Sequence, residues 1–534
     1  MSSHYSTRSL PKGHACVDCR CDSVRPICGP CTRAARFEDC EYVDGAYATS
    51  NVQQLEESIH RIQHRIMDLE RPRNTSPHVS TLKNPYSGNS EGHSRNPPAS
   101  QSQQHIGVDR YIFRISPANS WPVSRSARNE TNVIVVQTLR LALDTFAPYA
   151  HEVGFFLNQK RFRNTCLHTR DDNEELPAGL LSAICLWAAY VSSAGPLASQ
   201  ESNFLSQALP MATAFLSSGH RLKILYGIQT EVLLCQYLLH KGRLVEAQYH
   251  LSLAVSHVVL GNLSSIRSAR GVIPQDSIEE GELIAAFWTV FSMDKIWSSA
   301  LNFPSNFVSA SNIDTPWPLE TEEYERSPRS EQLQSENTVQ RFIEDVSGAD
   351  RGVSCLAILA KSAILLERAT NVAGQWRPNM SPSETTAFFK SFTTLNNRIK
   401  RFRDSLLNPN ALASCTIAMK PRIILAQSVA HAATIQLNRT FIAANPQCRE
   451  LCLTACQSIV WIMRAAGIRK LGYINPIVGP IWSATGQVLL EEIRRLGAVH
   501  TSAAVFADLK SAYDEIVASI TCFSRNCPFM GTPR

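Results

Sequence analysis

The stretch CVDCRCDSVRPICGPCTRAARFEDC, residues 16–40, holds six of the sixteen cysteines of the 534-residue chain. Thiolates this dense either pair as disulfides or bind a soft metal, and the redox compartment decides between the two. The residues before Cys16 are polar and basic, without the apolar segment of a secretion signal. We therefore expect a reducing compartment, in which the cysteines bind zinc.

Two Cys-x2-Cys pairs each place two sulfurs on one turn, a spacing that suits tetrahedral Zn²⁺. Six thiolates can close two tetrahedra if two sulfurs bridge both metals, so the count predicts a binuclear cluster. Its zinc ligands are Cys16, Cys19, Cys21, Cys28, Cys31 and Cys40. The alternative is one zinc held by the two Cys-x2-Cys pairs, with Cys21 and Cys40 as spare thiols. Such a site would only fold the N-terminus.

Residues 21–42 resemble the second half of the Zn2Cys6 cluster of fungal transcription regulators. The matching residues are Cys21-Asp22, Arg25-Pro26-Ile27-Cys28, Gly29-Pro30-Cys31 and Cys40-Glu41-Tyr42. The resemblance implies that Cys16 and Cys28 are the bridging ligands. It also implies a head over residues 8–50 that binds double-stranded DNA, at CGG-like half-sites, and a nuclear regulator of RNA polymerase II genes.

The head departs from that family between its second and third cysteines, where Arg20 alone stands in place of a mostly basic segment about five residues longer. In the family this segment carries base and phosphate contacts. Three explanations are open: a piece omitted from the sequence as written, a variant with impaired DNA binding, or another site formed by the cysteines. The formal charge of residues 1–50 is zero. The candidate phosphate contacts that remain are Arg20, Arg25 and Arg33.

A heptad pattern follows the head over residues 51–70. Apolar residues recur at alternating steps of three and four, namely Val52, Leu55, Ile59, Ile62, Ile66 and Leu69. β-Branched residues at one core position with mostly leucine at the other favour a parallel two-stranded coiled coil. We expect a homodimer or heterodimer through this helix; the alternative is an amphipathic helix packed on its own domain. Two heads on one coil would read two half-sites.

Residues 71–130 are polar and rich in Ser, Asn and Pro, and are expected to form a flexible linker because they cannot bury enough apolar surface. Residues 131–525 read as one large all-α domain, since apolar residues recur at helical spacing, as in Phe388, Phe392, Leu395, Ile399 and Phe402. Prolines such as Pro177 and Pro446 divide the run into helices of ordinary length. The fold class expected is therefore mainly all-α.

The large domain resembles the fungal-specific middle regulatory domain found downstream of such clusters. The matching segments are FFLNQKRF at 155–162, LLSAICLW at 180–187 and FWTVFSMDKIWSSALNFPSNF at 287–307. The last departs from the commonest family form at Lys295 and Asn302. The resemblance implies a regulatory domain with all-α structure.

Four features of this domain have ordinary explanations. Residues 178–191 are too short for a membrane span and are expected to form a buried helix. Asp294 and Lys295 are expected to make an ion pair at a surface or between helices. Cysteines 448, 452 and 456 are expected to act as small buried apolar residues rather than as a sensor. The acidic segment 314–335 is interpreted as a solvated loop, with contact to the transcription machinery as the alternative.

The sequence has no phosphate loop, nucleophile elbow or HExxH helix, so an enzyme is not expected. No membrane partner is expected. The leading hypothesis is a dimeric, zinc-dependent DNA-binding transcription regulator. The alternative is a helical interaction module that dimerises with related regulators and sequesters them without reading DNA. A small-molecule effector of the 131–525 domain is compatible with both.

Overall fold

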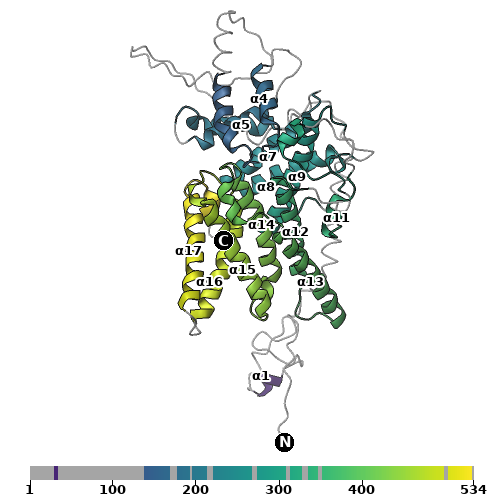
Figure 1. The fold of residues 1–534 in the computed structure, drawn as a ribbon, viewed down its shortest axis with the longest axis vertical. Helices are drawn as coiled ribbons and strands as arrows, with labels where there is room; N and C mark the ends of the chain where they lie inside the picture. Colours follow the sequence, from purple (N-terminus) through teal and green to yellow (C-terminus); the bar gives the residue numbers. More distant parts are fainter. Residues whose placement is uncertain are drawn as a thin grey trace, which may run out of the picture. The chain divides into compact units, whose positions relative to one another are not determined.

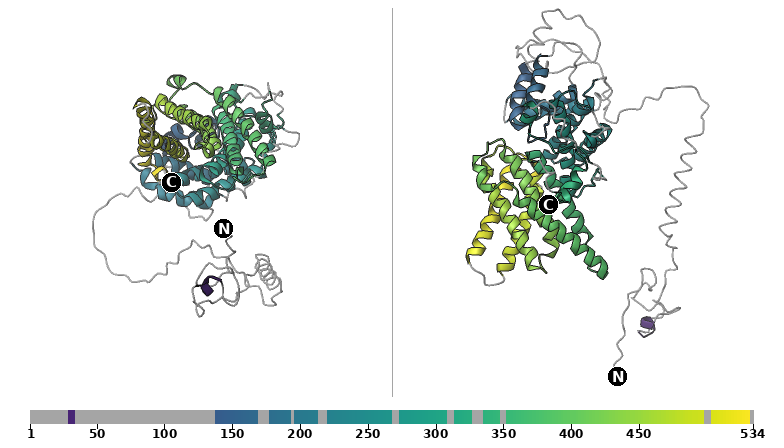
Figure 2. Two further views of the ribbon diagram at one scale, coloured as in Figure 1. Left: turned by 90° about the horizontal axis from the view of Figure 1, so that it is seen from below. Right: turned by 45° about the vertical axis from the view of Figure 1, so that its right-hand side comes forward.

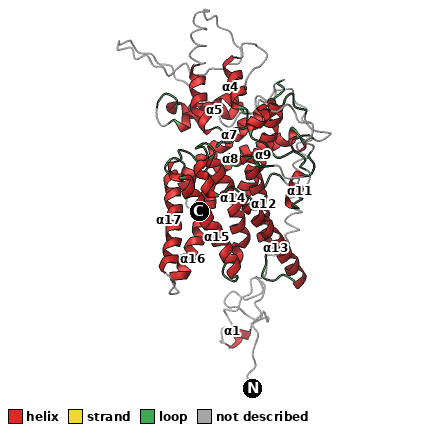
Figure 3. Ribbon diagram, in the orientation of Figure 1, coloured by secondary structure: helices red, strands yellow, loops and turns green. Residues whose placement is uncertain are grey.

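The structure is a computed structural model, and it describes residues 29–33, 137–168, 177–192, 195–212, 220–267, 273–307, 313–326, 335–346, 352–497 and 503–531. The chain divides into two units, Met1–His105 and Ile106–Arg534. In the first unit the described residues form helix α1 (Gly29–Arg33). In the described part of the second unit all regular structure is helical, which confirms the all-α prediction for that part (Figure 3).

The helices of the second unit begin with residues 137–146, which lead into the short η2 (Ala147–Tyr149). There follow α4 (Gln159–His168), α5 (Ala178–Val191), α6 (Glu201–Met211), α7 (Lys223–His240), α8 (Leu244–Leu260), α9 (Ser277–Leu301), α10 (Thr321–Arg326), α11 (Thr338–Ile343), α12 (Cys355–Gln375), α13 (Pro382–Asp404), α14 (Lys420–Asn438), α15 (Pro446–Ala466), α16 (Val478–Gly497), α17 (Ala503–Ser524) and α18 (Pro528–Gly531).

Helix α9 lies at the centre of the second unit, and eighteen of its 25 residues are buried. It packs against α7 and α8 on one side and against α12 on another, and α12 in turn packs on α14. The long helices from α12 to α17 run alongside one another (Figure 1), and a second view shows the same arrangement (Figure 2, right). One hydrophobic core runs through all of these elements.

The helix ends follow from local sequence. Asp276 precedes α9 and accepts a hydrogen bond from the Glu279 amide at 2.7 Å. Ser381 and Glu384 form a capping box at the start of α13, with Pro382 in the first turn. Gly467 ends α15 at a φ of 65°, in the left-handed region that glycine adopts without strain.

Two sequence predictions about single helices are confirmed. The segment 178–191 is helix α5, and ten of its residues are buried. The apolar stripe of α13 faces the core, because its five predicted residues are all buried. No helix in the part of the chain that the structure describes is both long and apolar enough to cross a membrane.

The interpretation of residues 314–335 as a solvated loop is wrong for the described part, residues 314–326. Trp317 stacks on Trp288 of α9 with ring centroids 4.4 Å apart. The Trp288 indole N–H donates to the Pro316 carbonyl at 2.6 Å, and residues 321–326 form α10. The prediction of a solvated loop was based on the acidic side chains of this segment, whereas its packing depends on the contact between Trp317 and Trp288.

Candidate functional site

The predicted zinc and DNA residues lie mostly outside the described residues. Cys31 lies in α1 and is buried, and Arg33 ends that helix and is exposed. Outside the description lie Cys16, Cys19, Cys21, Cys28, Cys40, Arg20 and Arg25, the coiled-coil residues Val52, Leu55, Ile59, Ile62, Ile66 and Leu69, and the linker 71–130. Within the described ranges, no three His, Cys, Asp or Glu side chains gather as a metal site. These assignments therefore stay predictions.

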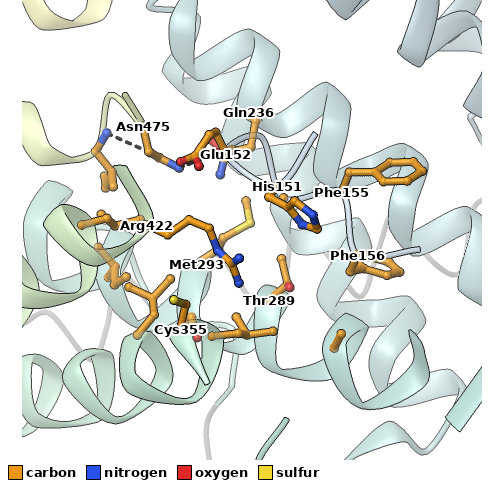
Figure 4. Close-up of a pocket in the computed structure, with 18 of the residues that line it drawn as sticks. His151, Glu152, Phe155, Phe156, Gln236, Thr289, Met293, Cys355, Arg422 and Asn475 are labelled. Carbon is orange, nitrogen blue, oxygen red and sulfur yellow. Dashed lines mark hydrogen bonds between the residues drawn. The ribbon is translucent and has the colours of Figure 1, made fainter. Parts of the chain in front are cut away.

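The second unit holds a cavity of about 130 Å³ between its helices. Helices α7, α9, α12 and α14 form its walls, together with the segments 151–156, 319–321 and 475–477. Polar groups enter it from several walls, as Figure 4 shows for Glu152, Gln236, Asn475 and Arg422. Apolar side chains of α9, α12 and α14 complete the lining, among them Met293, Ile296, Leu356, Leu359 and Leu425.

The turn that carries His151 and Glu152 is held by Gln229 of α7. The Gln229 amide donates to the Gly154 carbonyl at 3.1 Å and accepts from the Phe156 N–H at 2.8 Å. Gly154 has a φ of 80°, and a Cβ at this position would lie 2.8 Å from Val232 Cγ1. Any other residue would therefore push the turn away from α7. Gln229 of α7 thus holds the turn in place, and His151 and Glu152 of the turn line the cavity.

Glu152 and His151 are both held in their neutral forms. Burial raises the pKa of the Glu152 carboxyl to about 8, against the opposing influence of the nearby Arg422 charge. Burial, helped by Arg422, lowers the pKa of His151 to about 4. His151 is nevertheless an exposed residue by accessible surface, and it lines the cavity. Its Nε2 lies 3.2 Å from Gln159 Nε2, which donates to the neutral ring.

Arg422 enters the cavity from the first turn of α14. Among the described residues its recorded ion-pair partner is Glu320, at 3.4 Å between Nη2 and Oε2. Glu320 is engaged elsewhere, since its Oε1 accepts the Cys355 N–H at 2.7 Å at the start of α12. A guanidinium has five N–H donors, and the recorded contact with Glu320 uses one of its nitrogens. In Figure 4 the side chain extends toward the middle of the cavity.

Gln236 of α7 completes the polar set. Its side chain is only 3% exposed, and its Oε1 has no hydrogen-bond donor in the structure. A buried acceptor left without a donor costs roughly 1–3 kcal/mol. Asn475 is bonded by contrast, because its Nδ2 donates to the Glu152 carbonyl at 3.4 Å and its Oδ1 accepts from the Ile477 N–H at 3.1 Å.

Sequence reasoning missed this cavity. His151 looks isolated in the sequence, and Gln236 and Arg422 lie far along the chain from Glu152. No spacing rule joins residues that meet only when four helices pack. The one local signal is Gly154, two residues after Glu152, which permits the turn.

A second polar cluster, which we call the α9 network, lies on the same helix and contains Asp294, Lys295, Ser305 and Glu367. Lys295 is 2% exposed and donates to Glu367 Oε1 at 2.6 Å, to Ser305 Oγ at 3.1 Å and to the Phe307 carbonyl at 3.0 Å. The expected interhelical ion pair is thus present, but between α9 and α12. Asp294 is not its partner.

Asp294 instead anchors the chain after α9. Its carboxylate accepts from the Asn306 N–H at 2.8 Å, the Ser305 hydroxyl at 2.7 Å and the Phe307 N–H at 3.3 Å. Lys295 and Asp294 are therefore both hydrogen-bonded within the fold, which gives the network a structural role.

A larger hollow of about 930 Å³ lies along α9, α11, α12 and α13. Two of its charged side chains, Lys295 and Glu367, are paired with each other. A third, Arg398, donates to the Phe342 carbonyl at 2.7 Å. These three charged side chains are therefore already paired or hydrogen-bonded within the fold, whereas Gln236 Oε1 in the smaller cavity has no donor.

The comparison with protein families places this fold. Residues 143–404 match the family described as the fungal specific transcription factor domain. No curated protein and no solved structure was found to match the chain. The match covers the helices from the end of the first segment to α13, while Arg422 and Asn475 of the cavity lie beyond it. The second unit thus contains a fungal specific transcription factor domain, which indicates a fungal transcription regulator.

Proposed function

We propose that the protein is a zinc-dependent, sequence-specific DNA-binding regulator of RNA polymerase II genes that works as a dimer in the nucleus. The observation that carries the proposal is the order of the two features: a dense cysteine head at residues 16–40 precedes a domain that matches the fungal specific transcription factor family. That family supports a role in transcription, and the head supplies residues suited to holding DNA.

The six head cysteines fit zinc by their chemistry, because thiolates in Cys-x2-Cys pairs are preferred ligands of Zn²⁺. Bound zinc would fold the head and has no catalytic role here. Arg20, Arg25 and Arg33 would contact phosphates, and the helix 52–69 would join two chains on paired CGG-like half-sites. The helical domain would contact the transcription machinery.

One observation favours a second function. Because Arg20 alone separates Cys19 from Cys21, the head lacks the basic segment of its relatives. A chain with such a head would dimerise through residues 52–69 and sequester related regulators without binding DNA itself.

The test is zinc content and DNA binding of the full chain. We expect two zinc ions per chain by native mass spectrometry, and binding to a CGG-containing duplex that weakens steeply with salt and disappears on chelation. A matched variant carries five basic residues inserted between Arg20 and Cys21. If the natural chain holds one zinc or none while the insertion restores two and DNA binding, the sequestering function is the correct one. DNA binding that survives zinc removal contradicts the proposal.

A further inference from the structure

The cavity contains polar groups with which a bound ligand could form hydrogen bonds and an ion pair. Arg422 offers donors and a positive charge, while Gln236 offers an acceptor without a donor. The Glu152 carboxyl makes no recorded hydrogen bond and lines the same cavity. Folding leaves a buried polar group unpaired at a cost. Gln236 Oε1 is such a group, and it lines the cavity together with the half-buried Glu152 and Arg422 side chains, so the cavity is suited to a polar ligand.

The Arg422 guanidinium and the neutral Glu152 carboxyl line the same cavity. Arg422 is close enough to influence the pKa of Glu152, yet the two form no ion pair in the structure. In Figure 4 the Glu152 and Gln236 side chains lie on the same side of the view, and the Arg422 guanidinium extends toward the middle. A ligand between them would meet two acceptors at one end and a bidentate donor at the other.

The volume limits the size of that ligand. A cavity of about 150 Å³ in another protein holds benzene, so one of about 130 Å³ takes roughly six to eight non-hydrogen atoms. Met293, Ile296 and Leu356 offer an apolar wall for part of it. The ligand is therefore small, with one donor group, one acidic group and a short apolar body.

We propose that the cavity binds a small aliphatic free α-amino acid such as alanine or valine. Its carboxylate pairs with the Arg422 guanidinium, which matches a carboxylate bidentately. Its ammonium donates to Gln236 Oε1 and to the Glu152 carboxylate, and its side chain packs on α9 and α12. The inference concerns the helical domain alone and does not depend on the zinc head or on DNA binding.

Binding of a ligand ammonium to the Glu152 carboxylate should release the proton that Glu152 carries in the free protein. Three groups from other elements interact electrostatically with Glu152: Arg422 of α14, Cys355 of α12 and Tyr473 of the segment before α16. His151 is next to Glu152 in the chain, and Glu320 and Glu322 influence His151. Burial raises the pKa of Cys355 to about 11 and raises that of Tyr473, and the pKa of His151 is about 4. Near pH 7, Glu152 is thus the group whose proton an ammonium would displace.

Binding would join two parts of the chain. Glu152 and Gln236 lie within the family match at 143–404, whereas Arg422 lies beyond it. A ligand held by both would tie α14 to α7 and α9 and would stabilise the domain by mass action.

The experiment is calorimetric titration of the full chain with valine at pH 7, in two buffers of different ionisation enthalpy. We expect saturable binding with release of up to one proton per chain. N-acetylvaline lacks the ammonium and isobutylamine lacks the carboxylate, so each should bind at least about tenfold more weakly. Valine binding without proton release, or N-acetylvaline binding as tightly as valine, would overturn the proposal. Absence of binding for both alanine and valine at millimolar concentration would also overturn it.

Variants assign the contacts. E152Q should bind valine at least about tenfold more weakly and release no proton, and R422Q should lose at least as much affinity. R469Q is the matched control, because Arg469 pairs with Glu515 on the surface at 3.3 Å, and it should bind like the natural chain. Melting temperatures recorded without ligand show that each variant is folded. Natural affinity in a folded R422Q would contradict the assignment.

Discussion

The cavity and the α9 network place charged groups in the interior of the same domain, but they satisfy them differently. In the α9 network Lys295 has three acceptors, including Glu367 at 2.6 Å, and Asp294 has four donors among residues 305–307. In the cavity Gln236 Oε1 has no donor, and the Glu152 carboxyl stays protonated near neutral pH.

Because of this difference we interpret the α9 network as a structural element and the cavity as a candidate binding site. A buried charge with all its partners fixes the segments that hold it, as the α9 network fixes the chain after α9. A buried group without partners costs stability, and such sites are retained where a ligand supplies what is missing. The two regions therefore make opposite predictions for substitutions that remove a polar group.

The largest effect is expected in the α9 network. K295M leaves the Glu367 carboxylate without its cation and should destabilise the domain by about 3–5 kcal/mol, measured by urea unfolding. K510M is the control, since Lys510 pairs with Asp514 at an exposed site, at 3.4 Å, and should change stability by less than about 1 kcal/mol. Equal stability of K295M and the natural chain would show that the network does not hold the fold.

Two glutamines on α7 sharpen the comparison. Q229L removes both bonds that hold the 154–156 turn and should cost about 2–4 kcal/mol, because the Gly154 carbonyl and Phe156 amide lose their partners. Q236L removes an acceptor that has no donor and should raise stability by about 1 kcal/mol in the absence of ligand. If Q236L is less stable than Q229L, Gln236 makes a stabilising interaction in the folded chain.

The smallest effect is expected at the cysteines of α15. Cys448, Cys452 and Cys456 are buried, and burial raises the pKa of Cys452 to about 12. Their thiols should therefore react with a thiol reagent only when the domain unfolds. Mass spectrometry after brief labelling of the native chain checks this, with Cys522, which is partly exposed, as the internal reference. Rapid labelling of Cys456 in the native chain would revive a sensing role.

Local features of the fold were predictable because they depend on neighbours in sequence. Pro177 precedes α5, Pro446 stands in the first turn of α15, and the stripe from Phe388 to Phe402 forms the buried face of α13. The thiol stripe was rightly interpreted as part of the core. Each of these predictions uses only helical periodicity and the backbone limits of proline.

The site was not predictable, because its residues meet only through tertiary packing. Lys295 pairs with Glu367, 72 residues away, rather than with the adjacent Asp294, whose side chain turns to the chain after α9. Glu152 and Arg422 also lie far apart in the chain, in the turn before α4 and in α14. The zinc ligands, by contrast, are predicted from spacing alone, and this stays a prediction because all but Cys31 lie outside the described residues.

The most direct test of this account is the stability of E152Q against the natural chain at pH 6 and pH 8. In the folded chain Glu152 has a pKa of about 8, above its ordinary 4.5, so between these values the folded state holds a proton that the unfolded state has lost. Stability of the natural chain therefore falls as pH rises, and Gln escapes this penalty.

We predict that E152Q is the more stable in urea unfolding, and that its advantage grows by about 2 kcal/mol from pH 6 to pH 8. E492Q is the control, because hydrogen bonds from Arg495 lower the pKa of Glu492, and its deficit should not change between these pH values. An E152Q chain that is less stable at pH 8, or whose advantage does not change with pH, would show that the cavity does not hold Glu152 in its protonated form.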